Sequence, residues 1–166
     1  DELRFTGPYG RFYVRESAKE PLLFLAGGSG LSSPKSMILH LFEQDENRPV
    51  TFIYGARNQA ELYYRDLFEE LARDYPNFTY LPVLSAEPED SEWQGLRGFV
   101  HEAAKTHFTG KFAGHKAYMC GPPAMIDACI TTLMQGRLFE RDMYMENYYT
   151  QASRNTAPKS PLFKNI

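Results

Sequence analysis

Short apolar runs alternate along this chain with segments whose apolar residues recur every three or four positions. Runs that are apolar along most of their length are typical of buried strands, and they span residues 21–26, 49–54, 78–84, 116–120 and 142–146. The segments between them place apolar side chains on one helical face, as at Met37, Ile38, Leu41 and Phe42, at Leu67, Phe68, Leu71, Ala72 and Tyr75, and at Met125, Ile126, Ile130, Leu133 and Met134. A shorter helix is predicted to begin near Phe99.

This alternation predicts an α/β fold. Strands that alternate with helices are joined by crossovers, which make neighbouring strands parallel. We therefore expect a three-layer α/β/α domain with a five- to six-stranded, mainly parallel sheet. Pro82 indicates a position near the sheet edge or near the end of its strand, and the polar residues 85–98 are predicted to form a loop. Ligands of such sheets bind beyond the carboxyl ends of the strands.

The composition excludes several classes of function. With 166 residues, 43% of them hydrophobic, the chain suits one folded domain rather than general disorder. A net charge of −3 with mixed signs offers no basic surface for nucleic acid, and no apolar run approaches the ~20 residues of a membrane span. The two cysteines and four histidines lack the spacing of iron–sulfur or metal sites. We expect no metal in this chain and a reducing, cytoplasmic setting.

The residues after the first strand form the most informative motif. Residues 27–30 read Gly-Gly-Ser-Gly, which allows a tight turn whose backbone a ligand can approach. Ser33 is a good N-cap residue and Pro34 suits a first helical position, so free N–H groups would point at one place, as a phosphate requires. The third glycine of the usual dinucleotide fingerprint is missing, and a purely structural turn is the alternative.

Two charged residues follow the second strand. Arg57, close after Gly55, stands where the usual fingerprint has a carboxylate. The sequence leaves three roles open for Arg57: facing an adenosine phosphate, stacking on adenine, or lying solvated on the surface. Glu61 either binds ribose hydroxyls or caps the helix that follows.

The fourth and fifth strands end on a second group of candidates. In Cys120-Gly-Pro-Pro123, Gly121 permits close approach and the prolines stiffen the turn and begin a helix. Cys120 is either a small polarisable side chain in the cleft or a buried structural cysteine; no histidine nearby in sequence supports a thiol nucleophile. Glu146, followed by Tyr148, is either the wall of a site or a surface carboxylate.

Together these motifs resemble one family. With Gly7-Pro-Tyr-Gly10 before them and Met145-Glu-Asn-Tyr148 after them, they occur in the order found in the nicotinamide-binding half of the ferredoxin–NADP reductase superfamily. The resemblance covers the chain up to residue 150. It is greatest to the reductase components of multicomponent phenol hydroxylases, and next to those of methane and toluene monooxygenases.

The resemblance implies a three-part enzyme with a 2Fe–2S domain, an FAD barrel and an NADH-binding domain, which passes electrons to a di-iron hydroxylase. It implies that the pyrophosphate side of NADH lies on Gly27, Gly28, Ser29 and Gly30, near Ser33. It also implies a nicotinamide pocket lined by Cys120, Gly121 and Pro122, with Glu146 at the nicotinamide–flavin junction and Tyr148 shielding the flavin. Cys120 and Glu146 are then the catalytic candidates, and Gly55, Arg57 and Glu61 are the remaining cofactor-binding candidates.

The chain lacks the Arg-x-Tyr-Ser flavin motif and the cysteine run of a 2Fe–2S cluster. We therefore expect it to bind NADH but neither FAD nor iron by itself. Residues 1–15 are predicted to be the last strand of a truncated FAD barrel, 16–150 the NAD-binding domain, and 151–166 a tail, so a longer protein is expected. The alternatives are a non-catalytic nucleotide-sensing module, which needs neither Cys120 nor Glu146, and a fragment that docks on the hydroxylase through its tail.

Overall fold

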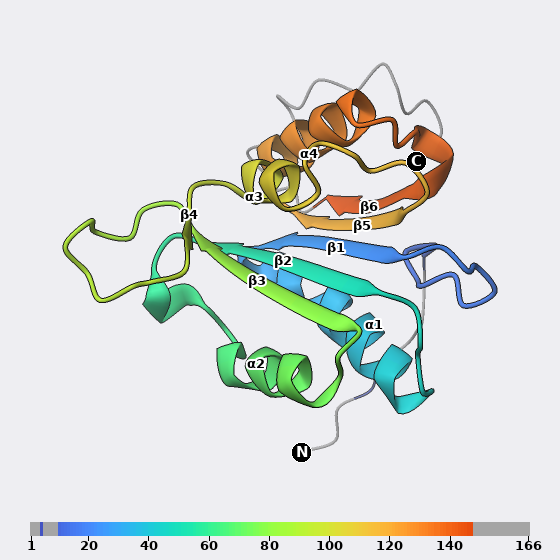
Figure 1. Ribbon diagram of the computed structural model, residues 1–166, viewed down its shortest axis with the longest axis horizontal. Coiled ribbons are helices and arrows are strands. Elements are labelled where there is room, and N and C mark those ends of the chain that lie inside the picture. Colours follow the sequence, from blue (N-terminus) through green and yellow to red (C-terminus); the bar gives the residue numbers. More distant parts are fainter. Residues whose placement is uncertain (1–3, 5–9, 148–166) are drawn as a thin grey trace.

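In the computed structural model, one parallel sheet organises the described residues, which are residue 4 and residues 10–147 (Figure 1). The strand order is β4-β3-β2-β1-β5-β6, and every neighbouring pair is parallel. The strands are β1 (Leu22–Gly27), β2 (Val50–Ala56), β3 (Phe78–Leu84), β4 (Leu96–Arg97), β5 (Lys116–Gly121) and β6 (Met143–Asn147). The α-helices are α1 (Ser32–Glu43), α2 (Arg65–Asp74), α3 (Val100–His107) and α4 (Pro123–Gln135), with short 3-10 helices η1 (Gly28–Leu31), η2 (Gln59–Glu61) and η3 (Glu140–Asp142).

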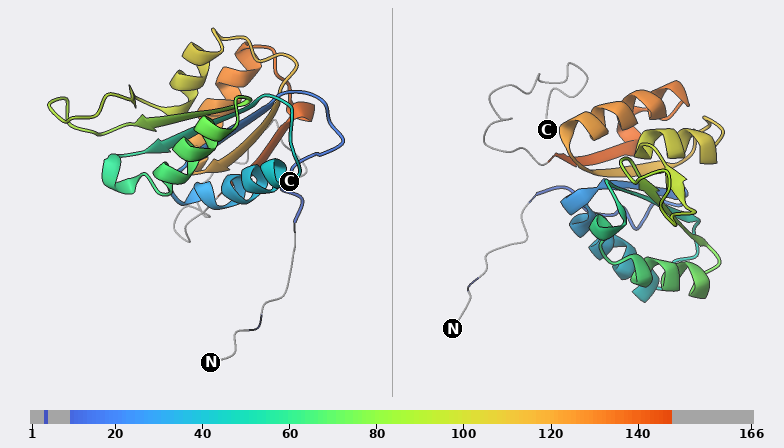
Figure 2. Two further views of the ribbon diagram at one scale, coloured as in Figure 1. Left: turned by 60° about the horizontal axis from the view of Figure 1, so that its bottom comes forward. Right: turned by 90° about the vertical axis from the view of Figure 1, so that its left-hand side faces the viewer.

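The helices cover both faces of the sheet. α1 and α2 pack on one face, and α3 and α4 on the other (Figures 1 and 2). Alternate residues of β1 pack in the cores on the two faces of the sheet. Phe24 lies in the core under α1 and α2, and Leu25 lies in the core under α3 and α4. Because both faces are buried, the central strands read as continuous apolar runs rather than alternating ones. The predicted three-layer α/β/α fold is confirmed.

The order in which the strands are added to the sheet reverses between β1 and β5, while the strands stay parallel. From β1 the sheet grows through β2, β3 and β4 on one side, and through β5 and β6 on the other. The carboxyl ends of all strands lie at the same edge, at the left of Figure 1. Open α/β sheets bind ligands at such a reversal, beyond the carboxyl ends of the two central strands.

The predicted loop over residues 85–98 contains a short strand that the sequence did not indicate. β4 pairs only with Val83 and Leu84 of β3, and both of its residues are exposed, so no burial pattern marks it. Pro82 precedes this pairing and is matched only to Tyr54 of β2. The expectation from Pro82 is thus confirmed, because a missing N–H is tolerated where no further strand pairs.

The residues before β1 pack against the domain. Val14 is buried in the core, and the Arg15 N–H donates to the Tyr118 hydroxyl at 2.9 Å. The structure assigns no strand to residues 10–15, and the other residues of the predicted barrel strand lie outside the described part, apart from residue 4. The predicted tail, 151–166, also lies outside it, so both boundaries stay predictions. Among the described residues, no helix is long and apolar enough to cross a membrane.

Candidate functional site

The glycine turn runs directly from β1 into α1. Gly28 has a φ of +55°, and a Cβ there would meet no atom within 4 Å, so its backbone is open to a ligand. Gly30 serves another purpose, since a Cβ there would lie 2.2 Å from the Cys120 carbonyl oxygen. The interpretation that all these glycines keep the turn open to a ligand therefore holds for Gly28 but is wrong for Gly30, and also for Gly27, where a Cβ would lie 2.7 Å from Met125 Sδ. The missing side chain of Gly30 lets the turn pack against the end of β5.

Ser33 does not cap α1, contrary to the prediction. η1 continues into α1, the N-cap position falls on Leu31, and no side chain caps the helix. Ser33 lies in the first turn of α1, and its hydroxyl donates to Glu146 Oε2 at 3.0 Å. The helix therefore begins one residue before Ser33, and the hydroxyl binds the Glu146 carboxylate of β6 instead of capping the helix.

Cys120 and Glu146 lie side by side at the ends of β5 and β6, where they are register partners. Cys120 is fully buried, and its Sγ lies 3.9 Å from Glu146 Oε2. Gly121 is buried behind it, and Pro122 is the exposed N-cap residue of α4. The structure thus makes Cys120 a buried cysteine that also contacts the candidate carboxylate.

A tyrosine links the glycine turn to the end of β2. The Tyr54 hydroxyl donates toward the carbonyl oxygens of Gly28 at 3.1 Å and Glu61 at 3.4 Å. Burial raises the pKa of Tyr54 to about 12, so this hydroxyl keeps its proton at neutral pH. Glu61 therefore lies close to the turn, although it follows the turn by 31 or more positions in the sequence.

Glu61 does not cap α2, which begins after Tyr64. It ends η2, where Asn58 holds it twice: Asn58 Oδ1 accepts from the Glu61 N–H and Asn58 Nδ2 donates to Glu61 Oε1, both at 3.3 Å. Arg57 is exposed, and its side chain forms no hydrogen bond or ion pair with the other described residues. Gly55 packs against α3, because a Cβ would lie 2.5 Å from Val100 Cγ2.

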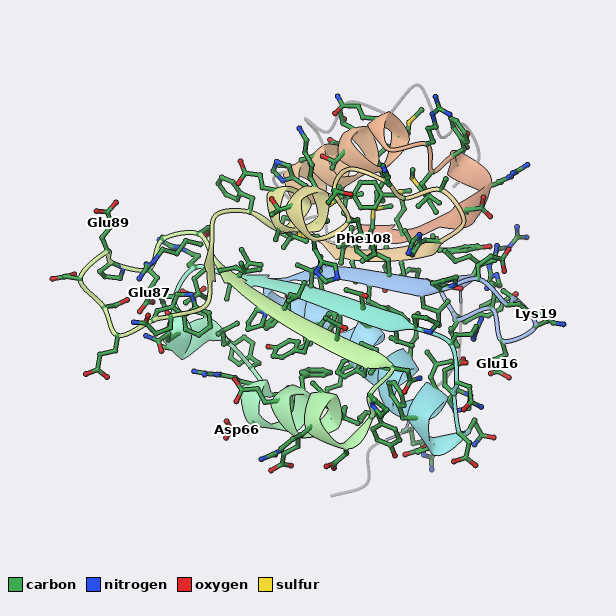
Figure 3. The ribbon with its side chains drawn as sticks, in the orientation of Figure 1. Glu16, Lys19, Asp66, Glu87, Glu89 and Phe108 are labelled. Carbon is green, nitrogen blue, oxygen red and sulfur yellow. The ribbon has the colours of Figure 1, made fainter. Side chains whose placement is uncertain are left out.

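The sequence did not mark Glu87 as a candidate residue of the site. Glu87 lies on the loop between β3 and β4, as does Glu89 (Figure 3). Its carboxylate accepts from the Gln59 backbone N–H at 3.0 Å and from Gln59 Nε2 at 2.6 Å. The side-chain hydrogen bond from Gln59 holds the pKa of Glu87 below its ordinary value. Nothing in a loop rich in acidic residues marks this one, whereas Tyr54 could have been noticed as a tyrosine near a strand end.

Most of the predicted site residues thus meet at the reversal point of the sheet. Gly28, Gly30, Ser33, Cys120 and Glu146 surround the ends of β1, β5 and β6, and Tyr54 connects them to Glu61. Tyr148 lies outside the described residues. Among the described residues, no group of His, Cys, Asp or Glu is arranged to hold a metal ion.

The fold and this site define the class of the protein as a nucleotide-binding domain of the ferredoxin reductase-like type. Residues 24–130 match the family described as oxidoreductase NAD-binding domain. The chain belongs to that family.

Known relatives agree with this assignment. The chain is 59% identical over its full length to the phenol 2-monooxygenase reductase component DmpP of Pseudomonas sp. (strain CF600), and 52% identical to the phenol hydroxylase P5 protein of Acinetobacter pittii (strain PHEA-2). It spans 47% of the length of each, about half. The structure of the Amycolatopsis cytochrome P450 reductase GcoB superposes with a TM-score of 0.77 at 29% identity, over 85% of this chain and 42% of that one.

Proposed function

We propose that this chain is the NADH-binding domain of a reductase that carries electrons from NADH through FAD and a 2Fe–2S cluster to an oxygenase. The observation that carries the proposal is the meeting of the Gly28 turn with the Cys120 and Glu146 pair at the reversal point of the sheet. The names of the similar proteins, both reductase or phenol hydroxylase components, support the same reading. The FAD and 2Fe–2S groups belong to the longer protein that we infer, not to this chain.

The residues present suit a dinucleotide laid across the ends of β2, β1 and β5. Residues 27–30 would receive the pyrophosphate, since the backbone at Gly28 is open and anions bind at such turns. The adenosine half would lie toward Arg57 and Glu61, and the nicotinamide toward Cys120, Gly121 and Pro122. When bound, the dihydronicotinamide supplies a hydride. The chain's own part is to hold that ring in position, with Cys120 and Glu146 beside it.

The proposal names NADH rather than NADPH. Glu61 is held by Asn58 beside the glycine turn, and a carboxylate there accepts hydrogen bonds from ribose hydroxyls and repels a 2′-phosphate. Arg57 favours NADPH instead, because its positive charge attracts a 2′-phosphate. The two side chains therefore have opposite effects on the choice of nucleotide. Calorimetric titration of the chain with both nucleotides tests the choice. NADH should bind more tightly, and a clear preference for NADPH would overturn it.

The proposal also predicts what the chain does not do by itself. Purified, it should bind NADH yet be colourless and fail to reduce artificial electron acceptors. A flavin absorption band that remains after gel filtration would contradict this. In the full-length protein, Cys120→Ala and Glu146→Ala should slow hydride transfer while NADH still binds; unchanged hydride transfer would favour a nucleotide-sensing module.

The partner we propose is the di-iron hydroxylase of a phenol-oxidising system, in the cytoplasm. The support is the similarity to the two phenol hydroxylase components. Mixing the NADH-reduced full-length protein with such a hydroxylase should reduce the di-iron centre of the hydroxylase, and adding phenol and dioxygen should then yield a dihydroxybenzene and water. Hydroxylase that stays oxidised under these conditions would contradict the proposed partner.

A further inference from the structure

One oxygen atom of Glu146 contacts side chains of two other elements, α1 and β5. Glu146 Oε2, on β6, accepts a hydrogen bond from Ser33 Oγ of α1 at 3.0 Å. The same oxygen lies 3.9 Å from Cys120 Sγ of β5. The carboxylate is thus held from two sides, although Ser33 is 113 positions away in sequence.

The sheet geometry explains why these side chains meet. Cys120 and Glu146 each follow, by two residues, a member of the stacked pair Tyr118 and Tyr144, whose rings lie 4.9 Å apart. Side chains two positions apart on a strand point to the same face. Tyr118 belongs to the core cluster beneath α1, and Tyr144 packs against that cluster. Cys120 and Glu146 therefore also face α1, whose first turn carries Ser33.

The charge of Glu146 is not neutralised by the rest of the described residues. Its two contacts are a hydroxyl and a thiol, and no ion pair of the described part includes it. The partly buried Glu46, by comparison, is paired with Arg48, and Asp142 with Lys116. A carboxylate that is oriented but unpaired is suited to a ligand that carries positive charge.

We propose that Ser33 is a positioning residue that holds the Glu146 carboxylate toward the nicotinamide end of the site. This end then favours the positively charged oxidised ring over the neutral reduced ring. The inference rests on the proposed function, which places the nicotinamide there. Two unit charges in contact in water-like surroundings attract by an amount equal to about fivefold in affinity, so the chain should bind NAD⁺ about fivefold more tightly than NADH.

Titration calorimetry on the chain itself tests this with three ligands: NAD⁺, NADH and ADP-ribose, which lacks the nicotinamide. Ser33→Ala should reduce the preference for NAD⁺ toward equality, as should Glu146→Gln, and neither should change the affinity for ADP-ribose. Ser33→Thr keeps the hydroxyl and should retain the preference. Ser36→Ala is the matched control, because within the described part of the chain the Ser36 hydroxyl donates to the Ser32 carbonyl of its own helix and not to Glu146.

Two results would overturn the inference. One is a Ser33→Ala chain that keeps the wild-type preference while Glu146→Gln loses it, since Ser33 would then not position the carboxylate. The other is an equal loss of ADP-ribose and NAD⁺ affinity in Ser33→Ala, which would make Ser33 a general structural residue. A wild-type chain that binds none of the three ligands would instead contradict the proposed function itself.

Discussion

The contact between Gly30 and the end of β5 gives a prediction whose size follows from the coordinates. In Gly30→Ala, the new Cβ would lie 2.2 Å from the Cys120 carbonyl oxygen, 2.6 Å from its carbon and 2.8 Å from Gly121 Cα. Non-bonded carbon contacts settle at about 3.5–4.0 Å, and all three neighbours are backbone atoms, which cannot rotate away. The turn and β5 must therefore separate. Overpacking of this kind costs about 1–3 kcal/mol, and we expect the upper end, about 3 kcal/mol.

Urea unfolding of the purified chain measures this cost, and thermal unfolding should show a fall in Tm of about 6–12 °C. Gly28→Ala is the control, because it meets no atom within 4 Å and adds only the strain of a φ of +55°. That strain is worth about 1–2 kcal/mol. If Gly30→Ala proved as stable as Gly28→Ala, or more stable, the packing of the turn on β5 would not be what requires a glycine there.

Three smaller perturbations test other parts of the structure. Glu87→Gln should weaken NAD⁺ binding about threefold, since one charge-assisted hydrogen bond that holds the turn after β2 is weakened. Glu89→Gln, on the same loop, should leave the affinity for NAD⁺ unchanged. Equal losses of affinity in the two variants, measured by calorimetry, would contradict the role of Glu87 in holding this turn. Tyr54→Phe removes a buried hydroxyl between two carbonyl groups and should cost about 1 kcal/mol in urea unfolding; no loss would mean that the hydroxyl contributes nothing. Glu46 has a pKa lowered from 4.5, chiefly by its hydrogen bond from Arg48. Its stabilisation is therefore present above pH 4.5 and lost as the pH falls below it, so Glu46→Gln should be destabilising at neutral pH and equal to wild type in acid. A difference independent of pH would refute this.

The fold could be predicted because its signals are local. Both faces of the central strands are covered, so each strand appears as an uninterrupted apolar run, and each helix shows its buried face at helical spacing. β4 carries no such signal, because it has two residues and both are exposed. Its place depends on a partner strand, β3, and not on its own sequence.

The sequence predicted where the site lies in the fold, but not which residues contact one another there. Cys120, Glu146 and the glycine turn could be placed together because the ends of parallel strands share one edge. The contacts of each site residue could be found only from the structure. Ser33 was predicted to be a helix cap, because the local sequence cannot show that its hydroxyl binds a carboxylate 113 positions away. Gly30 looked like an opening for a ligand, since nothing local indicates that the Cys120 backbone lies against it.

The central claim is that this chain binds NAD(H) at the carboxyl ends of β1 and β5. An NMR titration of the isotope-labelled chain with NAD⁺ tests it most directly, because each backbone amide reports its own surroundings. We predict saturable shifts at Gly28, Ser29 and Gly121. No saturable shift, or shifts confined to residues 44–48 before β2 at the opposite end of the sheet, would contradict the claim.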